Sequence, residues 1–172
     1  MKGIGGRTAR AALAMAAILP VLAGCWWLEP SLGPGEWGLR RGGFGDGQPS
    51  HVASLYESDG FGQLIMDCGG GPISFRIASG RDSDLQDLSG LPVRYRLDGN
   101  PPVATQVSSN RIYLWFRDPA RATGEDPMVG QIAGARQLTV RIDWSPTDHQ
   151  IMRFDVSRAA GAIDWLRRGC AD

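Results

Sequence analysis

Apolar residues recur at every second position in a series of short runs between His51 and Val156. Successive side chains of a β-strand point to opposite faces of the sheet, so this alternation predicts strands with one buried face. A first strand is expected to begin at His51, and the runs that follow cover residues 64–68, 73–77, 93–97, 112–116, 138–144 and 152–156. Turn residues separate them, as in Gly69–Gly71. We therefore expect a mainly β fold, an antiparallel β-sandwich or a rolled sheet of about seven to nine strands.

One α-helix is expected at the carboxyl end of this β domain. Apolar residues recur there at helical spacing, at Ala159, Ala162, Ile163 and Leu166. Ser157 is expected to cap the helix by accepting a backbone N–H, and Gly169 to end it in a left-handed conformation. Arg167 and Arg168 then lie in the last turn, where positive charge suits the helix dipole.

The size and charge of the chain bound its function. Its 172 residues, 42% of them apolar, suit one globular domain. The 18 basic side chains balance the 18 acidic ones, and there are only two histidines. This composition argues against an electrostatic nucleic-acid binder and against a histidine-rich metal site. We expect no nucleic-acid partner, no metal and no cofactor.

The amino-terminal segment has the organisation of an export signal. Lys2, Arg7 and Arg10 form a positive start, and residues 11–22 form an apolar run without charge. Twelve residues are too few to span a bilayer as a permanent helix, but they suit the apolar region of a signal peptide. Small residues before Cys25 would let an extended chain enter a peptidase cleft, in the sequence Leu22-Ala23-Gly24-Cys25.

These residues resemble the lipobox of bacterial lipoproteins, which the lipoprotein signal peptidase cleaves before the cysteine. The resemblance implies that residues 1–24 are removed and that acyl chains on Cys25 anchor the protein to a membrane. Trp26 follows Cys25 in place of an aspartate retention signal, which implies the outer membrane, with the body facing the periplasm. An ordinary secretory signal with an incidental cysteine is the alternative. The mature chain would carry 15 basic and 18 acidic side chains, a net charge of −3.

A tether is expected between the anchor and the folded body. Residues 26–50 contain seven glycines and three prolines, a composition that disfavours both a helix and a β-ladder. We therefore divide the chain into a signal peptide (1–24), a lipidated cysteine with a flexible tether (25–50) and a single β domain (51–172). Trp26 and Trp27 are placed either at the lipid headgroups or against the body, and the sequence does not choose between them.

The two other cysteines are Cys68 and Cys170. Two thiols in one small domain usually pair in an oxidising compartment, so a disulfide is expected to join the terminal helix to the sheet. The spacing is not that of a zinc site, and no C-x-x-C redox motif is present.

The order of elements in the body resembles a known group of envelope proteins. A strand ending in Cys68, a strand over residues 93–98, a last strand reaching residues 154–157 and an alanine-rich helix ending at Cys170 resemble the VasI family, which is associated with type VI secretion. The resemblance spans about residues 60–170 and implies a disulfide-linked envelope protein. The early cysteine-rich stretch of that family is missing here, and no catalytic residue carries over.

No catalytic constellation is evident in the sequence. His51 and His149 are both expected at solvent-facing strand edges, and no nucleophile elbow is present. Asp82–Asp87 holds three carboxylates, which suit either a calcium-binding loop or, in preference, a solvated turn. Glu125 and Asp126 lie in a loop where neither is expected to have the apolar setting of a general acid. We therefore expect a protein that is not an enzyme.

A candidate partner surface lies on the outward faces of the predicted strands. Arg76, Arg94, Arg96 and Arg141 point outward, and Tyr113 and Trp115 alternate out of phase with the core. We take Arg94, Arg96, Tyr113 and Trp115 as a surface that would bind carboxylates, glycans or a protein. The favoured alternative is cross-strand pairing of the arginines with Asp67, Asp98, Asp118 and Asp143.

The sequence thus predicts a lipid-anchored cell-envelope protein with a non-catalytic β domain that serves as a binding or structural module. Its partner, besides the membrane, would be an envelope protein or a glycan. A periplasmic inhibitor that presents the loop Arg117–Met128 is one alternative, and a secretion-system accessory lipoprotein is another. A hydrolase is the least favoured.

Overall fold

The computed structural model describes residues 35–42, 51–58, 60–69, 71–81, 90–110, 113–117 and 123–171. The predicted signal peptide, Cys25, Trp26, Trp27 and the acidic stretch Asp82–Asp87 lie outside these residues. The same holds for Ile112 and Asp118.

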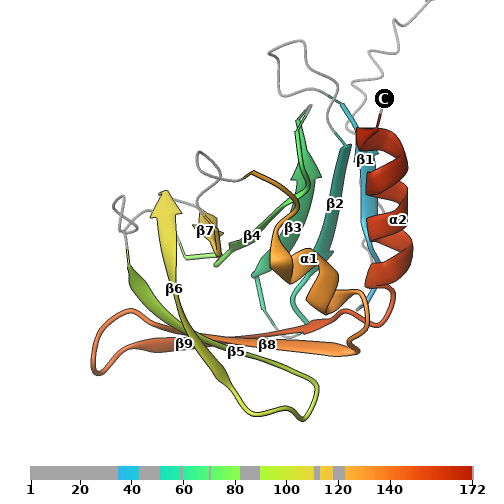
Figure 1. The fold of residues 1–172 in the computed structure, drawn as a ribbon. Coiled ribbons are helices and arrows are strands. Elements are labelled where there is room, and N and C mark those ends of the chain that lie inside the picture. The colour runs from blue at the N-terminus through green and yellow to red at the C-terminus, as the bar shows by residue number, and fades with distance from the viewer. Residues whose placement is uncertain are drawn as a thin grey trace, which may run out of the picture.

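The described residues form nine strands of one antiparallel sheet (Figure 1). The strands are β1 (Gly38–Arg41), β2 (His51–Tyr56), β3 (Gln63–Cys68), β4 (Ser74–Ala78), β5 (Leu91–Leu97), β6 (Val103–Asn110), β7 (Tyr113–Trp115), β8 (Gln137–Asp143) and β9 (His149–Asp155). Their order across the sheet is β1-β2-β3-β4-β7-β6-β5-β8-β9. The predicted mainly β fold is confirmed, and of the two expected forms the open, rolled sheet is the one observed (Figure 1).

The roll arises at β6, which pairs with two different neighbours. Val103–Val107 pairs with β5, whereas Ser108–Asn110 pairs with β7. In Figure 1 the strands β5, β8 and β9 consequently run crosswise to β2 and β3. One continuous sheet therefore wraps around a single core, and its inner face supplies most of the buried apolar residues.

The strand register follows the predicted alternation. Leu64 lies opposite Leu55 on β2 and opposite Ile77 on β4, and Leu114 on β7 lies opposite Ile77. Residues directly opposite each other in antiparallel strands share a face. All four side chains are fully buried.

Two helices cover the inner face of the roll: α1 (Pro127–Ile132) and α2 (Ala159–Cys170) (Figure 1). The predicted apolar face of α2 is confirmed, because Ala159, Ala162, Ile163 and Leu166 are all buried. The helix packs mainly on β2. The short helix α1 adds Met128, Val129 and Ile132 to the same core.

Both predicted ends of the carboxyl-terminal helix are wrong. The helix begins after Arg158, and Ser157 makes no cap; its own N–H donates to the carboxylate of Asp155, 3.1 Å away. Gly169 does not end the helix, which continues to Cys170. A Cβ on Gly169 would lie 2.5 Å from Nε2 of His51, so close packing against β2 accounts for this glycine.

The prediction that residues 26–50 contain no β-ladder is wrong at Gly38–Arg41. This segment is β1, which pairs along its full length with β2. β1 is paired on one edge only in the described sheet. Its hydrogen-bond partners are backbone groups of β2, so the pairing does not require apolar residues in β1. Glycine and arginine are well tolerated in such a short edge strand.

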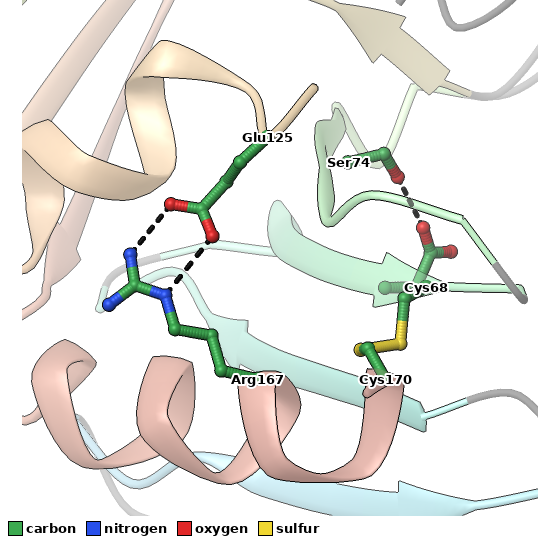
Figure 2. Close-up of a disulfide and its surroundings, with 6 residues drawn as sticks. Cys68, Ser74, Glu125, Arg167 and Cys170 are labelled. Atoms are coloured by element: carbon green, nitrogen blue, oxygen red, sulfur yellow. Dashed lines mark hydrogen bonds and ion pairs between the residues drawn. A yellow bond between two sulfur atoms is a disulfide. The ribbon is translucent and has the colours of Figure 1, made fainter. Parts of the chain in front are cut away.

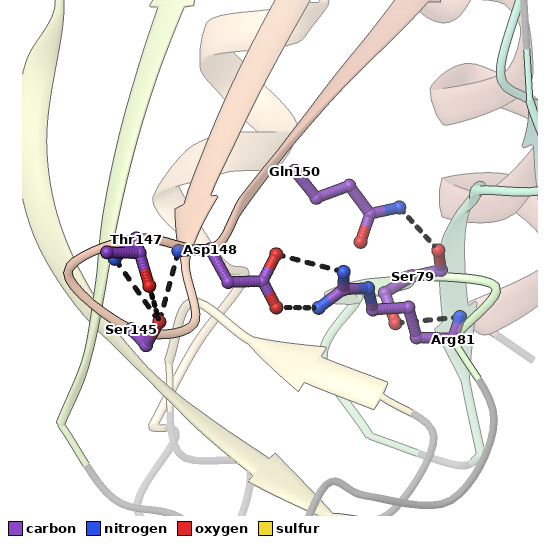
Figure 3. Close-up of polar contacts among 6 residues, drawn as sticks. All are labelled: Ser79, Arg81, Ser145, Thr147, Asp148 and Gln150. Atoms are coloured by element: carbon purple, nitrogen blue, oxygen red, sulfur yellow. Dashed lines mark hydrogen bonds and ion pairs between the residues drawn. The ribbon is translucent and has the colours of Figure 1, made fainter.

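Contacts along β9 close the roll (Figure 3). Ser58, in the turn between β2 and β3, donates its N–H to the carbonyl of Arg153 at 3.0 Å. Gln150 Nε2 donates to the carbonyl of Ser79 at 2.8 Å. We call this contact zone the closing seam. A bidentate ion pair completes it, with N···O distances of 2.7 and 3.0 Å between Arg81 and Asp148.

Gly80 meets special steric demands beside the closing seam. Its φ of +70° lies in the left-handed region that favours glycine. A Cβ at this position would lie 2.9 Å from both Cβ and the carbonyl oxygen of Phe61. The turn between β2 and β3 therefore packs directly on the backbone after β4.

Gly80→Ala is expected to lower the free energy of unfolding by about 1–3 kcal/mol, because it adds both a strained φ and a backbone clash. Gly99→Ala is the matched control: Gly99 has no positive φ and no atom within 4 Å of an added Cβ. The control should change the stability by less than about 1 kcal/mol. Urea unfolding of the oxidised protein measures both, and equal effects would contradict the assigned role of Gly80.

Candidate functional site

The predicted disulfide between Cys68 and Cys170 is confirmed (Figure 2). It joins the last residue of β3 to the last residue of α2, with Cα atoms 6.0 Å apart and a sequence separation of 102. Closure of a loop of this length stabilises a fold by about 4–5 kcal/mol in the chain-entropy account. The bond thus holds the terminal helix on the sheet.

His51 lies beside this disulfide and not at a solvent-facing edge, so that prediction is wrong. It is opposite Cys68 in the pairing of β2 with β3 and is half-buried. Its ring packs edge-on against Trp165, with centroids 5.1 Å apart. Nδ1 is buried and makes no hydrogen bond to the described residues. His149, at the start of β9, is exposed as predicted.

A cluster of polar and aromatic side chains covers the outer face of β3, β4 and β7. The guanidinium carbon of Arg76 lies 4.7 Å from the ring centroid of Tyr113 and 5.0 Å from that of Trp115. Arg76 also forms an ion pair with Asp67, which accepts the hydroxyl hydrogen of Ser74. We call these five residues the Arg76 cluster. The two rings are 6.3 Å apart and roughly perpendicular.

Arg76 faces away from the core, as predicted, but it is only 9% exposed because neighbouring side chains cover it. Cross-strand pairing, the alternative that the sequence favoured, is confirmed for its contact with Asp67. The charge of the guanidinium is therefore already compensated. The cluster is suited to stacking a planar or apolar surface on its rings rather than to capturing a free carboxylate.

The four residues of the predicted partner surface do not form one cluster. Arg94 lies opposite Ala104 on β6, whereas Trp115 lies opposite Ser108. Four positions along a strand correspond to about 13 Å. Arg94 and Arg96 are exposed on β5, so they flank the Arg76 cluster at a distance and do not join it.

Two other carboxylates predicted to pair with arginines across strands, Asp143 and Asp98, have other contacts. Arg141 donates to Asp143 at 2.7 Å on the same strand, and this hydrogen bond lowers the pKa of the Asp143 carboxyl. Asp98 accepts two backbone N–H groups at the start of β8, each at 2.9 Å, and thereby fixes the turn after β5.

The predicted inhibitory loop is anchored to the body at its end. Asp126 N–H donates to the carbonyl of Ile73 at 3.0 Å. Glu125 forms a bidentate pair with Arg167 on α2, at 2.7 and 3.1 Å (Figure 2). Met128 is buried in the core. Contacts from Glu125, Asp126 and Met128 therefore hold this end of the loop against the body, and positions 118–122 lie outside the described residues.

The prediction that Asp126 lacks an apolar setting is wrong. It is 5% exposed and caps α1 by accepting the N–H of Met128 at 2.9 Å. Burial raises the pKa of its carboxyl. The signal was present in the sequence, because aspartate followed by proline is a typical helix start.

A shallow hollow of about 360 Å³ lies between β1 and the start of α2. It is lined by Glu36, Trp37, Leu39, Arg158, Gly161 and Ala162. Within the described ranges, no three histidine, cysteine, aspartate or glutamate side chains gather as a metal site. No helix in that same part of the chain is long and apolar enough to cross a bilayer.

Comparisons with models of known protein families, with curated proteins and with solved structures found no match to this chain.

Arg76→Ala is expected to lower the free energy of unfolding by about 3 kcal/mol, since it leaves the nearly buried Asp67 carboxylate without its ion pair. Arg96→Ala removes an exposed arginine and should change the stability by less than about 0.5 kcal/mol. Denaturant titration of both variants measures these changes in the free energy of unfolding. A loss at Arg76 as small as that at Arg96 would show that the cluster does not stabilise the outer face.

Asp126→Asn is expected to make the protein more stable at pH 7. The folded protein holds the Asp126 proton more tightly than the unfolded chain does, so this carboxyl stabilises the fold at low pH. That contribution is lost as the pH rises above about 4. The asparagine oxygen still accepts the N–H of Met128 but carries no charge.

The advantage of Asp126→Asn over wild type should therefore shrink when the pH falls from 7 to below 4. Asp126→Ala, which removes the cap, should cost about 1 kcal/mol relative to Asn at either pH. Urea midpoints at the two pH values test this. The stability of Asp126→Asn is compared with that of wild type at each pH. A smaller advantage at pH 7 than at low pH would refute the prediction.

Proposed function

We propose that this protein is a lipid-anchored cell-envelope protein whose β domain is a non-catalytic binding module. Acyl chains on Cys25 would hold it in a membrane, and the domain would face the periplasm from the outer membrane. The observation that carries this proposal is the Cys68–Cys170 disulfide. Intracellular thiols are kept reduced, so the disulfide supports export, as the Leu22–Cys25 motif does independently.

The Arg76 cluster is the surface that we assign to binding. Tyr113 and Trp115 are only half-buried, and Arg76 packs against both rings. Rings that are fixed before binding lose little conformational entropy when a partner docks on them. A glycan or a protein surface with planar or apolar groups matches these rings, and Arg94 and Arg96 supply positive charge farther along the sheet.

The anchor is tested with Cys25→Ala in cells given labelled palmitate. Wild type should be labelled and should stay with membranes in high salt, while the variant should lose the label because its only proposed acylation site is gone. Cys68→Ala/Cys170→Ala is the control that removes the other two thiols and should keep the label. An unlabelled wild type, or free thiols at residues 68 and 170 in protein from cells, would overturn the proposal.

Binding is tested in the same membranes with a photo-crosslinking amino acid on β6. Ser108 lies opposite Trp115, and Ala104 lies opposite Arg94, so one strand offers a matched pair of positions. Adducts from position 108 that disappear in Trp115→Ala would support the Arg76 cluster as the binding surface. Adducts from position 104 alone would move the surface to β5, and their absence at both positions would favour a structural role.

A further inference from the structure

Phe61, in the turn between β2 and β3, is the most exposed large apolar side chain of the described residues. It is 90% exposed, whereas the other exposed large apolar side chains range from 40% to 47%. A single exposed apolar residue is common on protein surfaces and by itself indicates nothing. Two further features give its exposure a meaning: the turn fixes the ring outside the core, and the turn lies near the start of the described body.

The turn is built so that the Phe61 ring stays outside. Glu57 N–H donates to the carbonyl of Gly62 at 2.8 Å, and Gly62 N–H donates to Oε2 of Glu57 at 3.1 Å. A Cβ on Gly62 would lie 2.8 Å from Sδ of Met152, and Gly80 packs on the Phe61 backbone from another side. Close packing therefore fixes the backbone of the turn on two sides and leaves the Phe61 ring exposed.

The chain enters the described body at this same end. β1 is antiparallel to β2, with Gly38 opposite Ser54, so the residues before β1 lie toward the end of β2 that leads into the Phe61 turn. Gly35 packs against the carboxylate of Asp155. Arg153 lies two positions before Asp155 on β9, hence about 7 Å from it, and its carbonyl accepts the N–H of Ser58.

The proposed anchor is close to this end in sequence. Ten peptide steps separate Cys25 from Gly35, and ten residues span at most about 35 Å even when fully extended. A lipid on Cys25 would therefore keep Gly35, and with it the Phe61 end of the body, within about 35 Å of the bilayer. The part of the body farthest from Gly35 has no such constraint.

The charge of this end favours insertion of an apolar group over electrostatic attachment. Exposed Arg153 and Arg158 are accompanied by the acidic residues Glu36, Glu57 and Asp155. The proposed mature chain is acidic overall, so attraction to anionic headgroups gives no net advantage. An aromatic ring at the boundary between headgroups and acyl chains is favourable without any charge.

We infer that Phe61 inserts into the interfacial region of the bilayer to which Cys25 anchors the protein, so that the ring and the lipid together set the orientation of the β domain. This inference rests on the lipid anchor of the proposed function. It adds a second membrane contact, made by the folded body itself.

The test uses the mature acylated protein, purified from cells, labelled with 4-fluorophenylalanine and placed in phosphatidylcholine nanodiscs. Phe61→Leu identifies the ¹⁹F resonance of residue 61. Phe75 and Phe154 are fully buried and provide internal controls. Lipids spin-labelled on the acyl chain should broaden the Phe61 resonance more than those of Phe75 and Phe154, and a water-soluble paramagnetic agent should leave it sharp.

Broadening of the Phe61 resonance by the aqueous agent, and not by the lipid label, would overturn the inference. Broadening by neither would also overturn it, in favour of a contact with protein such as a second copy. Intact mass of the same sample separates the two proposals. An acylated Cys25 with a water-exposed Phe61 leaves the proposed function standing, whereas a chain without acyl groups refutes both.

Discussion

Where the edge of β9 meets the β2–β3 turn, the N–H of Ser58 donates to Arg153, and Gln150 and Arg81 attach the β8–β9 end to the residues after β4. A sheet of nine strands with two free edges would leave its apolar inner face open. The closing seam turns that sheet into a roll with one core, which the two helices then fill. The close packing of Gly62, next to Phe61, against Met152 of β9 also depends on this closure.

The disulfide and the Arg76 cluster stabilise the two faces of the same sheet. On the inner face, the Cys68–Cys170 bond keeps α2 against β2 and β3, with His51 packed between the strand and the helix. On the outer face, Arg76 is enclosed by two rings and a carboxylate. A domain fixed on both faces is a suitable scaffold for the rigid binding surface that we propose.

Local pattern accounts for the elements that were predicted correctly. β8 and β9 alternate clearly and bury one face. β3 and β4 keep their inward apolar residues at every second position, although Ile65 and Arg76 on the other face are buried too. α2 carries a continuous apolar stripe, so period and turn residues were sufficient for these elements. β1 and β6 were missed because their composition is polar or glycine-rich and their pairing comes from neighbouring strands. Tyr113 and Trp115 of the candidate surface do lie beside an arginine. That arginine is Arg76, because the register of β4 with β7 puts Arg76 opposite Trp115.

The sequence by itself determined the strand-rich class, the apolar stripe of the terminal helix and the pairing of two cysteines, because each follows from residue types at short spacing or from simple counting. Only the tertiary structure decided which side chains become buried charges, which glycines are required and where Phe61 lies relative to the start of the body. Those outcomes depend on contacts between residues that are far apart in the chain. His51 and Gly169 have ordinary sequence surroundings, and packing alone gives each its constraint. At Asp126 the sequence signals a helix start, but only packing buries the carboxyl.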